Sequence, residues 1–150
     1  MTQTKNHYAY PIGKEKILRI THNESPAHVG ALKYAVDFIV PEGTPVMVVA
    51  DGKIVEIKDD SDIGGKDKKY EPHGNYIEIQ HSNGEYSEYE HLQKGSAIIK
   101  VGEVVKQGQI IGYSGATGWI AHLGPHLHFM VGKYGKTVEE YETLEIQWKD

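Results

Sequence analysis

Alternating apolar and polar residues, broken by frequent turn residues, run through most of the chain. Short runs rich in Val, Ile and Tyr are separated by Gly, Asn, Asp and Pro, which favour turns. No segment carries an amphipathic helical pattern over about 11 residues or more. The pattern therefore predicts an all-β fold, a mainly antiparallel sheet built from sequential hairpins.

Several of these elements can be placed along the chain. In order, they are a short strand at 16–20, a turn at 23–26, a strand at 34–40, a hairpin of 45–50 and 53–57 turning at Asp51-Gly52, a polar loop at 58–74, a second hairpin of 75–81 and 85–92 turning at Asn83-Gly84, short strands within 101–112, a strand beginning near 126, and one helical turn at 137–141. Asp-Gly and Asn-Gly between alternating segments are strong hairpin signals. Alternation along 85–92 places Tyr89 and His91 on one face, and Glu88 and Glu90 on the other.

Composition narrows the class of protein. A chain of 150 residues has the length of a single domain with its own core. The net charge of −5 and the lack of a long Lys or Arg run argue against a nucleic-acid partner. The absence of cysteine excludes thiolate zinc sites, disulfides and a cysteine nucleophile. We expect no membrane span, because no apolar segment approaches about 18 residues, and the N-terminal residues lack the apolar core of a signal peptide.

Two histidines one residue apart lie near the C-terminal end, in the segment "GPHLHF" at 124–129. On a strand, His126 and His128 project from the same face, with their Cα atoms roughly 6.6 Å apart. That spacing suits a metal ion and a substrate group side by side. Taken alone, the pair is equally consistent with two surface histidines that bind nothing.

Three further candidates lie in other elements: His28, Asp37 and His91. Asp37 interrupts a β-branched run, where a buried carboxylate is costly unless it is paired, although a strand edge facing water would also accommodate it. A catalytic zinc site uses three protein ligands and leaves a fourth position for water. His28, Asp37 and one of the paired histidines would supply three ligands. The two remaining histidines could transfer protons and stabilise an oxyanion.

The other polar clusters are interpreted as surface features. The acidic residues within 58–74 do not have EF-hand spacing and are expected to be solvated. Five histidines are expected at the surface: His7, His22, His73, His81 and His122. Of these, His22 and His122 are the two that could compete for a metal.

Five sequence blocks in this order resemble peptidase family M23, the zinc metallopeptidases of the lysostaphin or LytM type. They are "HVGALKYAVDF", "PEGTPV" with "DGKIVEI", "GNYIEIQHSNGEYSEYEHL", "VGEVVKQGQIIGYSGATG" and "GPHLHF", and they extend from about 28 to 131. The resemblance implies a LytM/lysostaphin-like fold, related to the barrel-sandwich, with an active-site groove. It also implies one zinc ion per chain and a role for each candidate: His28, Asp37 and His128 bind the metal, His91 and His126 are catalytic, and Tyr89 donates a hydrogen bond to the developing oxyanion.

The chain departs from the common family pattern in three places. His28 precedes Asp37 by nine residues, as in a longer variant of the motif, whereas the short form has four. The link between Gly118 and Pro125 is longer than the usual one, which alters the groove wall. Met130 occupies a position where an acidic residue is common, so a hydrogen bond behind the metal ligands would be missing.

The implied activity is zinc-dependent hydrolysis of peptide bonds in peptidoglycan cross-links or stem peptides, outside the cytoplasm. Within one domain, the resemblance suggests an N-terminal extension (1–27), a peptidase core (28–132) and a C-terminal tail (133–150). Two alternatives stay open: a non-catalytic module that binds or regulates wall hydrolases, and a metallopeptidase with another peptide substrate. Residues 101–112 also resemble biotinyl and lipoyl carrier repeats, but the lysine motif of those carriers is absent. The sequence leaves the oligomeric state open.

Overall fold

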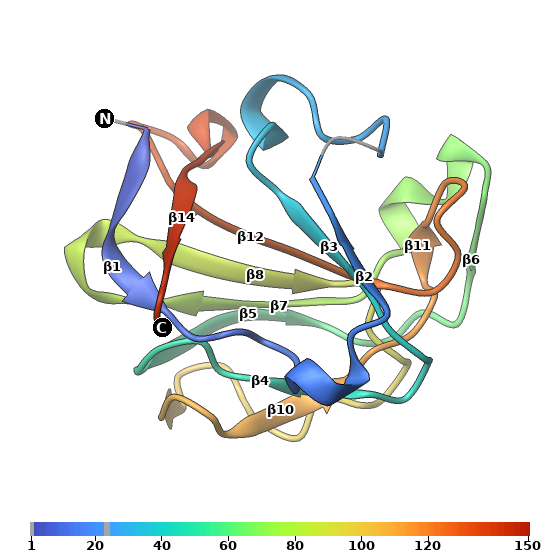
Figure 1. The fold of residues 1–150 in the computed structure, drawn as a ribbon, viewed down its shortest axis with the longest axis horizontal. Coiled ribbons are helices and arrows are strands. Elements are labelled where there is room, and N and C mark those ends of the chain that lie inside the picture. Colours follow the sequence, from blue (N-terminus) through green and yellow to red (C-terminus); the bar gives the residue numbers. More distant parts are fainter. Residues whose placement is uncertain (1, 23–24) are drawn as a thin grey trace.

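The computed structural model describes residues 2–22 and 25–150, and one antiparallel sheet dominates it (Figure 1). This main sheet has the strand order β2-β3-β12-β8-β7-β5-β9, and β13 pairs with β12. Its strands are β2 (Arg19–Thr21), β3 (Val36–Ile39), β5 (Gly52–Lys58), β7 (Tyr76–Gln80), β8 (Tyr86–Glu90), β9 (Val104–Val105), β12 (Leu127–Lys133) and β13 (Glu142–Thr143). The expected all-β, mainly antiparallel architecture is confirmed.

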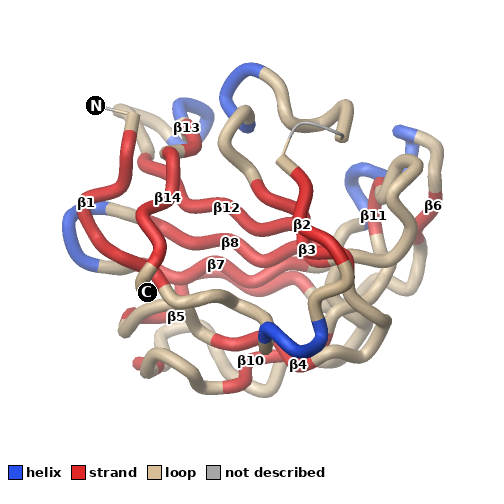
Figure 2. The backbone as a smooth tube through the Cα atoms, in the orientation of Figure 1, coloured by secondary structure: helices blue, strands red, loops and turns tan. Residues whose placement is uncertain are grey.

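Three two-stranded pairs complete the fold. They are β1 (Gln3–Tyr8) with β14 (Glu145–Trp148), β4 (Pro45–Met47) with β10 (Ile110–Tyr113), and β6 (Gly64–Gly65) with β11 (Gly118–Trp119). In Figure 2, β12, β8, β7 and β5 lie side by side, with β4 and β10 below them and β1 and β14 across their front. The two ends of the chain therefore pair with each other beside the main sheet. The division into extension, core and tail stays a prediction.

Short 3₁₀ helices connect these strands. They are η1 (Lys14–Lys16), η2 (Gly30–Leu32), η3 (Lys68–His73), η4 (Ser82–Gly84) and η5 (Val138–Glu140). The longest of them, η3, has six residues, and no helix in the described part of the chain is long and apolar enough to cross a membrane. The helical turn expected at 137–141 corresponds to η5.

The core lies on one face of the main sheet. Phe38 of β3, Tyr89 of β8 and Phe129 of β12 are fully buried. The ring of Phe129 packs against the rings of both Phe38 and Tyr89. Because side chains alternate along a strand, the neighbours of these aromatic residues point to the opposite face. That opposite face carries Asp37 and His128, so the alternation that builds the core also places the candidate site.

The hairpin predicted at 75–92 is confirmed, and the one predicted at 45–57 is wrong. Strands β7 and β8 pair antiparallel from Tyr76 to Gln80, around a turn in which Asn83 and Gly84 both have positive φ. In contrast, β4 pairs with β10, whereas β5 pairs with β7 and β9. Gly52 begins β5 instead of turning the chain: a Cβ there would lie 2.4 Å from the carbonyl oxygen of Gln80. Gly52 is therefore needed because it allows the neighbouring strand to approach closely.

The remaining boundaries shift by a few residues. The strand expected at 16–20 is observed at Arg19–Thr21, after η1, and the one expected at 34–40 is observed at Val36–Ile39. The polar loop 58–74 is largely exposed, but it contains β6 and η3. In the turn expected at 23–26, residues 23 and 24 lie outside the described residues.

Candidate active site

Two of the predicted ligands face each other across paired strands. Asp37 of β3 and His128 of β12 are direct partners in the antiparallel register. Both are buried, and Nδ1 of His128 lies 3.2 Å from Oδ1 of Asp37. The sheet therefore fixes their relative position through its backbone hydrogen bonds.

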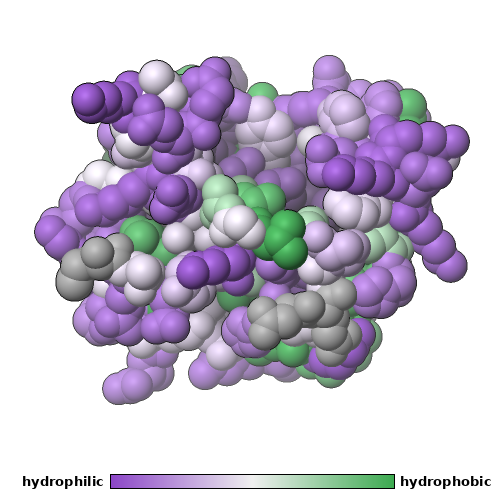
Figure 3. Space-filling model, turned by 90° about the horizontal axis from the view of Figure 1, so that it is seen from above, coloured by the Kyte–Doolittle hydropathy of each residue, from purple (hydrophilic) through white to green (hydrophobic). Residues whose placement is uncertain are grey.

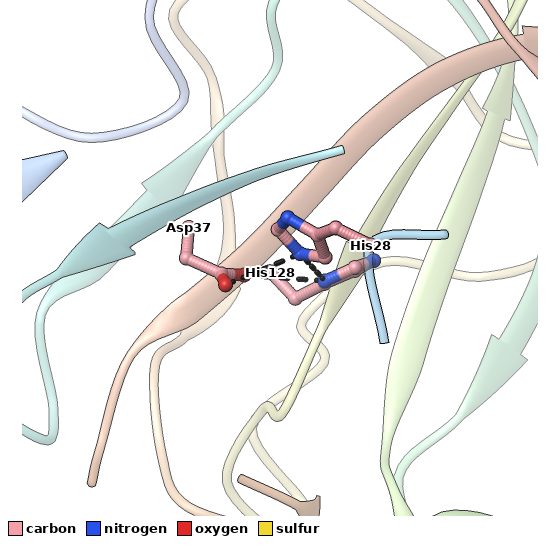
Figure 4. Close-up of side chains that lie close together, drawn as sticks. All are labelled: His28, Asp37 and His128. Atoms are coloured by element: carbon pink, nitrogen blue, oxygen red, sulfur yellow. Dashed lines mark hydrogen bonds and ion pairs between the residues drawn. The ribbon is translucent and has the colours of Figure 1, made fainter. Parts of the chain in front are cut away.

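The third ligand arrives from a loop. His28 precedes η2, and its buried ring approaches the other two from outside the sheet (Figure 4). Its Nδ1 atom forms a short hydrogen bond with the backbone carbonyl of His22. Because a carbonyl can only accept, Nδ1 carries the proton and Nε2 presents a lone pair to the site.

The spacing of the three ligand atoms fits one tetrahedral metal ion. Nε2 of His28 lies 3.3 Å from Nδ1 of His128 and 3.2 Å from Oδ2 of Asp37. A zinc ion about 2.0–2.1 Å from each ligand would separate tetrahedral ligand atoms by about 3.3 Å. Among the described residues, this trio is the group of His, Asp and Glu side chains close enough together to hold a metal ion.

The hydrogen-bond acceptors within the trio also favour a bound cation. The lone pair on Nε2 of His28 faces a carboxylate, so two acceptors meet. Oδ2 of Asp37 is fully buried and accepts no hydrogen bond from any described residue. Two imidazoles and one carboxylate are ligands that suit zinc. The residues present therefore fit a divalent metal.

The charge state of Asp37 is consistent with this role. Burial alone would raise the pKa of its carboxyl group, but the contact with His128 and the positive charge of that ring outweigh burial. The net effect holds the pKa of Asp37 well below its usual range. Asp37 is therefore ionised at neutral pH, as a metal ligand must be.

The two remaining predicted histidines lie beside the trio. The His91 and His126 rings are buried, with centroids 4.5 Å apart. Nδ1 of His91 lies 2.6 Å from the carbonyl oxygen of Thr117, and Nδ1 of His126 lies 2.8 Å from that of Gly124. Each ring therefore donates from Nδ1 and keeps a lone pair on Nε2. In His126 that atom lies 3.5 Å from Oδ1 of Asp37.

Burial keeps both of these rings neutral. Desolvation lowers the pKa of His126, an effect that the charge of Asp37 partly offsets. Desolvation also lowers the pKa of His91 well below its usual value, and the nearby His126 and His128 add to the shift. At neutral pH, both Nε2 atoms can therefore accept a proton from a reacting group.

These side chains open onto a small pocket of about 150 Å³. Its lining residues are Ser25, Ala27, Leu32, Glu71, Gly74, Glu90, His91, Trp119, His126 and His128. Figure 3 looks down on the loops at the top of Figure 1 and shows a mostly hydrophilic face with a recess between raised loops. The expected groove is therefore observed as a pocket that reaches two of the buried histidines and one ligand.

The structure contradicts the role expected for Tyr89. Its side chain is fully buried in the core, on the face of the sheet opposite the pocket. Its hydroxyl accepts a hydrogen bond from the backbone N–H of Val49 and another from Ser87. The role came from the family resemblance, and the separate expectation that Tyr89 and His91 share a face is also wrong. The strand ends at Glu90, and His91 has a φ of 71°, which turns its ring to the other side.

The surface histidines are largely as expected, with one correction. His22 and His122 are exposed, and neither belongs to the trio of candidate metal ligands. His81, expected at the surface, is buried. Its two ring nitrogens lie 2.9 Å from the carbonyl oxygen of Asp51 and 2.7 Å from Oγ of Ser87. The sequence around His81 does not indicate these partners, because His81 directly follows a strand and its contacts come from other elements and from tertiary packing.

Sequence reasoning missed three residues that line the pocket: Glu71, Glu90 and Trp119. Glu71 and Trp119 come from segments interpreted only as loops. Glu90 did carry a signal, because alternation placed it on the face opposite Tyr89. That face, not the face of Tyr89, is the one that carries the site.

Comparisons with known proteins identify the family and the fold. The family model described as peptidase family M23 matches residues 31–140. Peptidoglycan DD-endopeptidase ShyC of Vibrio cholerae is 39% identical over 113 residues, which are 74% of this chain and 23% of that protein. A zinc-containing peptidase from Vibrio cholerae superimposes with a TM-score of 0.60 at 30% identity, covering 84% of this chain and 36% of that one. The catalytic domain of the antimicrobial peptidase lysostaphin from Staphylococcus simulans superimposes with a TM-score of 0.58 at 32% identity, covering 83% of this chain and 87% of that domain.

The fold and the trio of candidate ligands together are typical of β-sheet metallopeptidases. This chain belongs to peptidase family M23, and its fold is that of the lysostaphin-type domains. It spans less than a third of the length of the curated relatives that match it. The matched family segment begins at Ala31, so His28 lies outside it.

Proposed function

We propose that this chain is a zinc-dependent endopeptidase that cleaves peptide bonds in peptidoglycan cross-links or stem peptides. One observation carries the proposal: three buried side chains converge, with pairwise separations of 3.2–3.3 Å between their closest polar atoms, next to two histidines whose Nε2 atoms are free to accept protons. His28, Asp37 and His128 would hold the metal, and His91 and His126 would be the catalytic residues.

A zinc ion held by these three ligands would polarise the scissile carbonyl and lower the pKa of water. His91 and His126 would carry out the accompanying proton transfers. One neutral ring accepts a proton from the attacking water, and the pair returns a proton to the leaving amine. The protonated form of His126 would be stabilised by Asp37, 3.5 Å away. Which of the two histidines acts as the base is left open.

The substrate class is supported by the named relatives. ShyC is named a peptidoglycan DD-endopeptidase, and lysostaphin is described as an antimicrobial peptidase. Peptidoglycan as substrate implies action in the cell envelope or after secretion. Against a non-catalytic binding module stands the fact that all five predicted ligands and catalytic histidines are present and buried together.

Cleavage assays test this proposal directly. Purified protein would be incubated with muropeptides and with pentaglycine, with and without a zinc chelator, and the products identified by mass spectrometry. We expect cleavage of at least one substrate, its loss on chelation and its return on addition of zinc. A variant with both His91 and His126 replaced by alanine provides the control for contaminating peptidases. Zinc-independent cleavage, or cleavage undiminished in that variant, would contradict the proposal.

A further inference from the structure

The four histidines of the site differ in how their second ring nitrogen is held. In His28, His91 and His126, Nδ1 hydrogen-bonds to a backbone carbonyl, which leaves Nε2 for the site. His128 is reversed: its Nδ1 faces Asp37 and the metal position. Its Nε2 is therefore the atom that needs an acceptor behind it. Histidines that bind metal almost always donate this second N–H to a carboxylate, a carbonyl or water.

A carboxylate lies behind His128. Oε2 of Glu90 is 3.9 Å from Nε2 of His128. Glu90 lies on β8 directly opposite His128 on β12, so the sheet register holds the two side chains as neighbours on one face. The Glu90 side chain is 27% exposed, and among the described residues it forms an ion pair with His128.

We propose that Glu90 is a positioning residue for the metal ligand His128. A side-chain rotation that shortens the 3.9 Å separation would let Glu90 accept a hydrogen bond from the Nε2–H group, which keeps the proton on that nitrogen and the lone pair on Nδ1. This hydrogen bond also fixes the rotation of the ring toward Asp37. This inference rests on the proposed metal site, and it assigns to β8 the acidic support that Met130 of β12 cannot give.

Zinc affinity of matched variants tests the inference. Glu90→Met keeps a side chain of similar length without an acceptor, whereas Glu90→Gln retains an oxygen that can accept from Nε2–H. Glu71 lines the same pocket, so Glu71→Met and Glu71→Gln control for pocket charge. Dissociation constants would be measured by competition with a chromophoric chelator. Thermal unfolding of each zinc-free variant would verify folding, with Glu90→Ala replacing Glu90→Met if the latter is unfolded.

We expect Glu90→Met to bind zinc about 10–100-fold more weakly, Glu90→Gln to recover most of the loss, and both Glu71 variants to match the wild type. The visible spectrum of the cobalt-substituted protein should change in Glu90→Met and not in Glu71→Met, because the geometry around His128 is altered. Unchanged zinc affinity in Glu90→Met, or an equal loss in Glu71→Met, would overturn the inference. If the wild type itself bound no zinc, both this inference and the proposed function would be rejected. Wild-type binding that Glu90→Met leaves intact would reject the role of Glu90 alone.

Discussion

Asp37 and His128 meet across two paired strands, with 3.2 Å between the carboxylate oxygen and Nδ1 of the ring. This pair links the fold to the site. Residues on either side of each partner fill the core, so any shift of register would move both the core and the ligands. The proposed metal position is therefore fixed by the most regular part of the molecule, and of the three proposed ligands only His28 comes from a loop.

Replacement of His28 tests the ligand that lies outside the matched family segment. We expect His28→Ala to lose zinc binding, because two ligands remain of the three that the metal needs. His22→Ala is the matched control. His22 holds the ring of His28 through its backbone carbonyl, which survives the substitution. Metal analysis after dialysis measures both. Zinc retained in His28→Ala and lost in His22→Ala would assign the ligand to His22 instead.

Replacement of His91 and His126, the proposed catalytic histidines, should separate metal binding from catalysis. We expect His91→Ala and His126→Ala to retain one zinc per chain and to lose about 10²-fold or more in kcat, the usual scale of acid–base and oxyanion contributions. Steady-state kinetics with parallel metal analysis measures this. Loss of metal in His126→Ala but not in His128→Ala would exchange the roles of these two residues. Full activity in either alanine variant would remove that residue from catalysis.

Tyr89 should matter for stability and not for the chemical step. Its hydroxyl accepts two hydrogen bonds in the core. Tyr89→Phe leaves the buried N–H of Val49 without a partner, whereas Ser87 can still pair with His81. We expect a loss of about 1–3 kcal/mol in the free energy of unfolding, with kcat unchanged. Tyr86→Phe, on the opposite face of the same strand, should change stability by less than about 0.5 kcal/mol. Urea unfolding and kinetics would be compared. A large fall in kcat at full stability would restore Tyr89 to the active site.

The buried His81 should make stability depend on pH. Burial lowers its pKa, an effect that the hydrogen bond to Asp51 and nearby charges only partly offset. The unfolded chain therefore binds a proton more readily, and the stabilising contribution of neutral His81 is present above about pH 6.5 and is lost as the pH falls below it. His81→Gln should be less stable than wild type at about pH 8, and this difference should narrow at about pH 5. Urea unfolding at the two pH values measures it. A difference that stays constant or widens would contradict the burial of a neutral ring.

Much of the site could be predicted from local sequence because it follows strand alternation. An aspartate inside a β-branched run and a His-x-His at a strand start both place polar groups on the face opposite the core, and the structure brings Asp37 and His128 together there. The second hairpin was predictable for a similar reason, since Asn83 and Gly84 both take the positive φ that such turns require.

The errors occur where tertiary packing decides the outcome. Asp51-Gly52 has the composition of a turn, but Gly52 is needed because the backbone of Gln80 passes too close for a side chain. His91 has a left-handed backbone conformation, which turns its ring to the face opposite the one that strand alternation predicts. No local sequence pattern predicts this conformation. Glu90 was assigned to the correct face, but its relation to His128 depends on a strand pairing across about 40 positions of sequence.

The most direct test of the central claim is the zinc content of the purified chain, measured beside that of Asp37→Asn. Asn keeps the size of the side chain and removes the charge that balances the metal. We predict one zinc ion per wild-type chain and a dissociation constant raised by well over 10-fold in Asp37→Asn. Equal zinc content and affinity in the two proteins, or no zinc in the wild type, would contradict the assignment of this site.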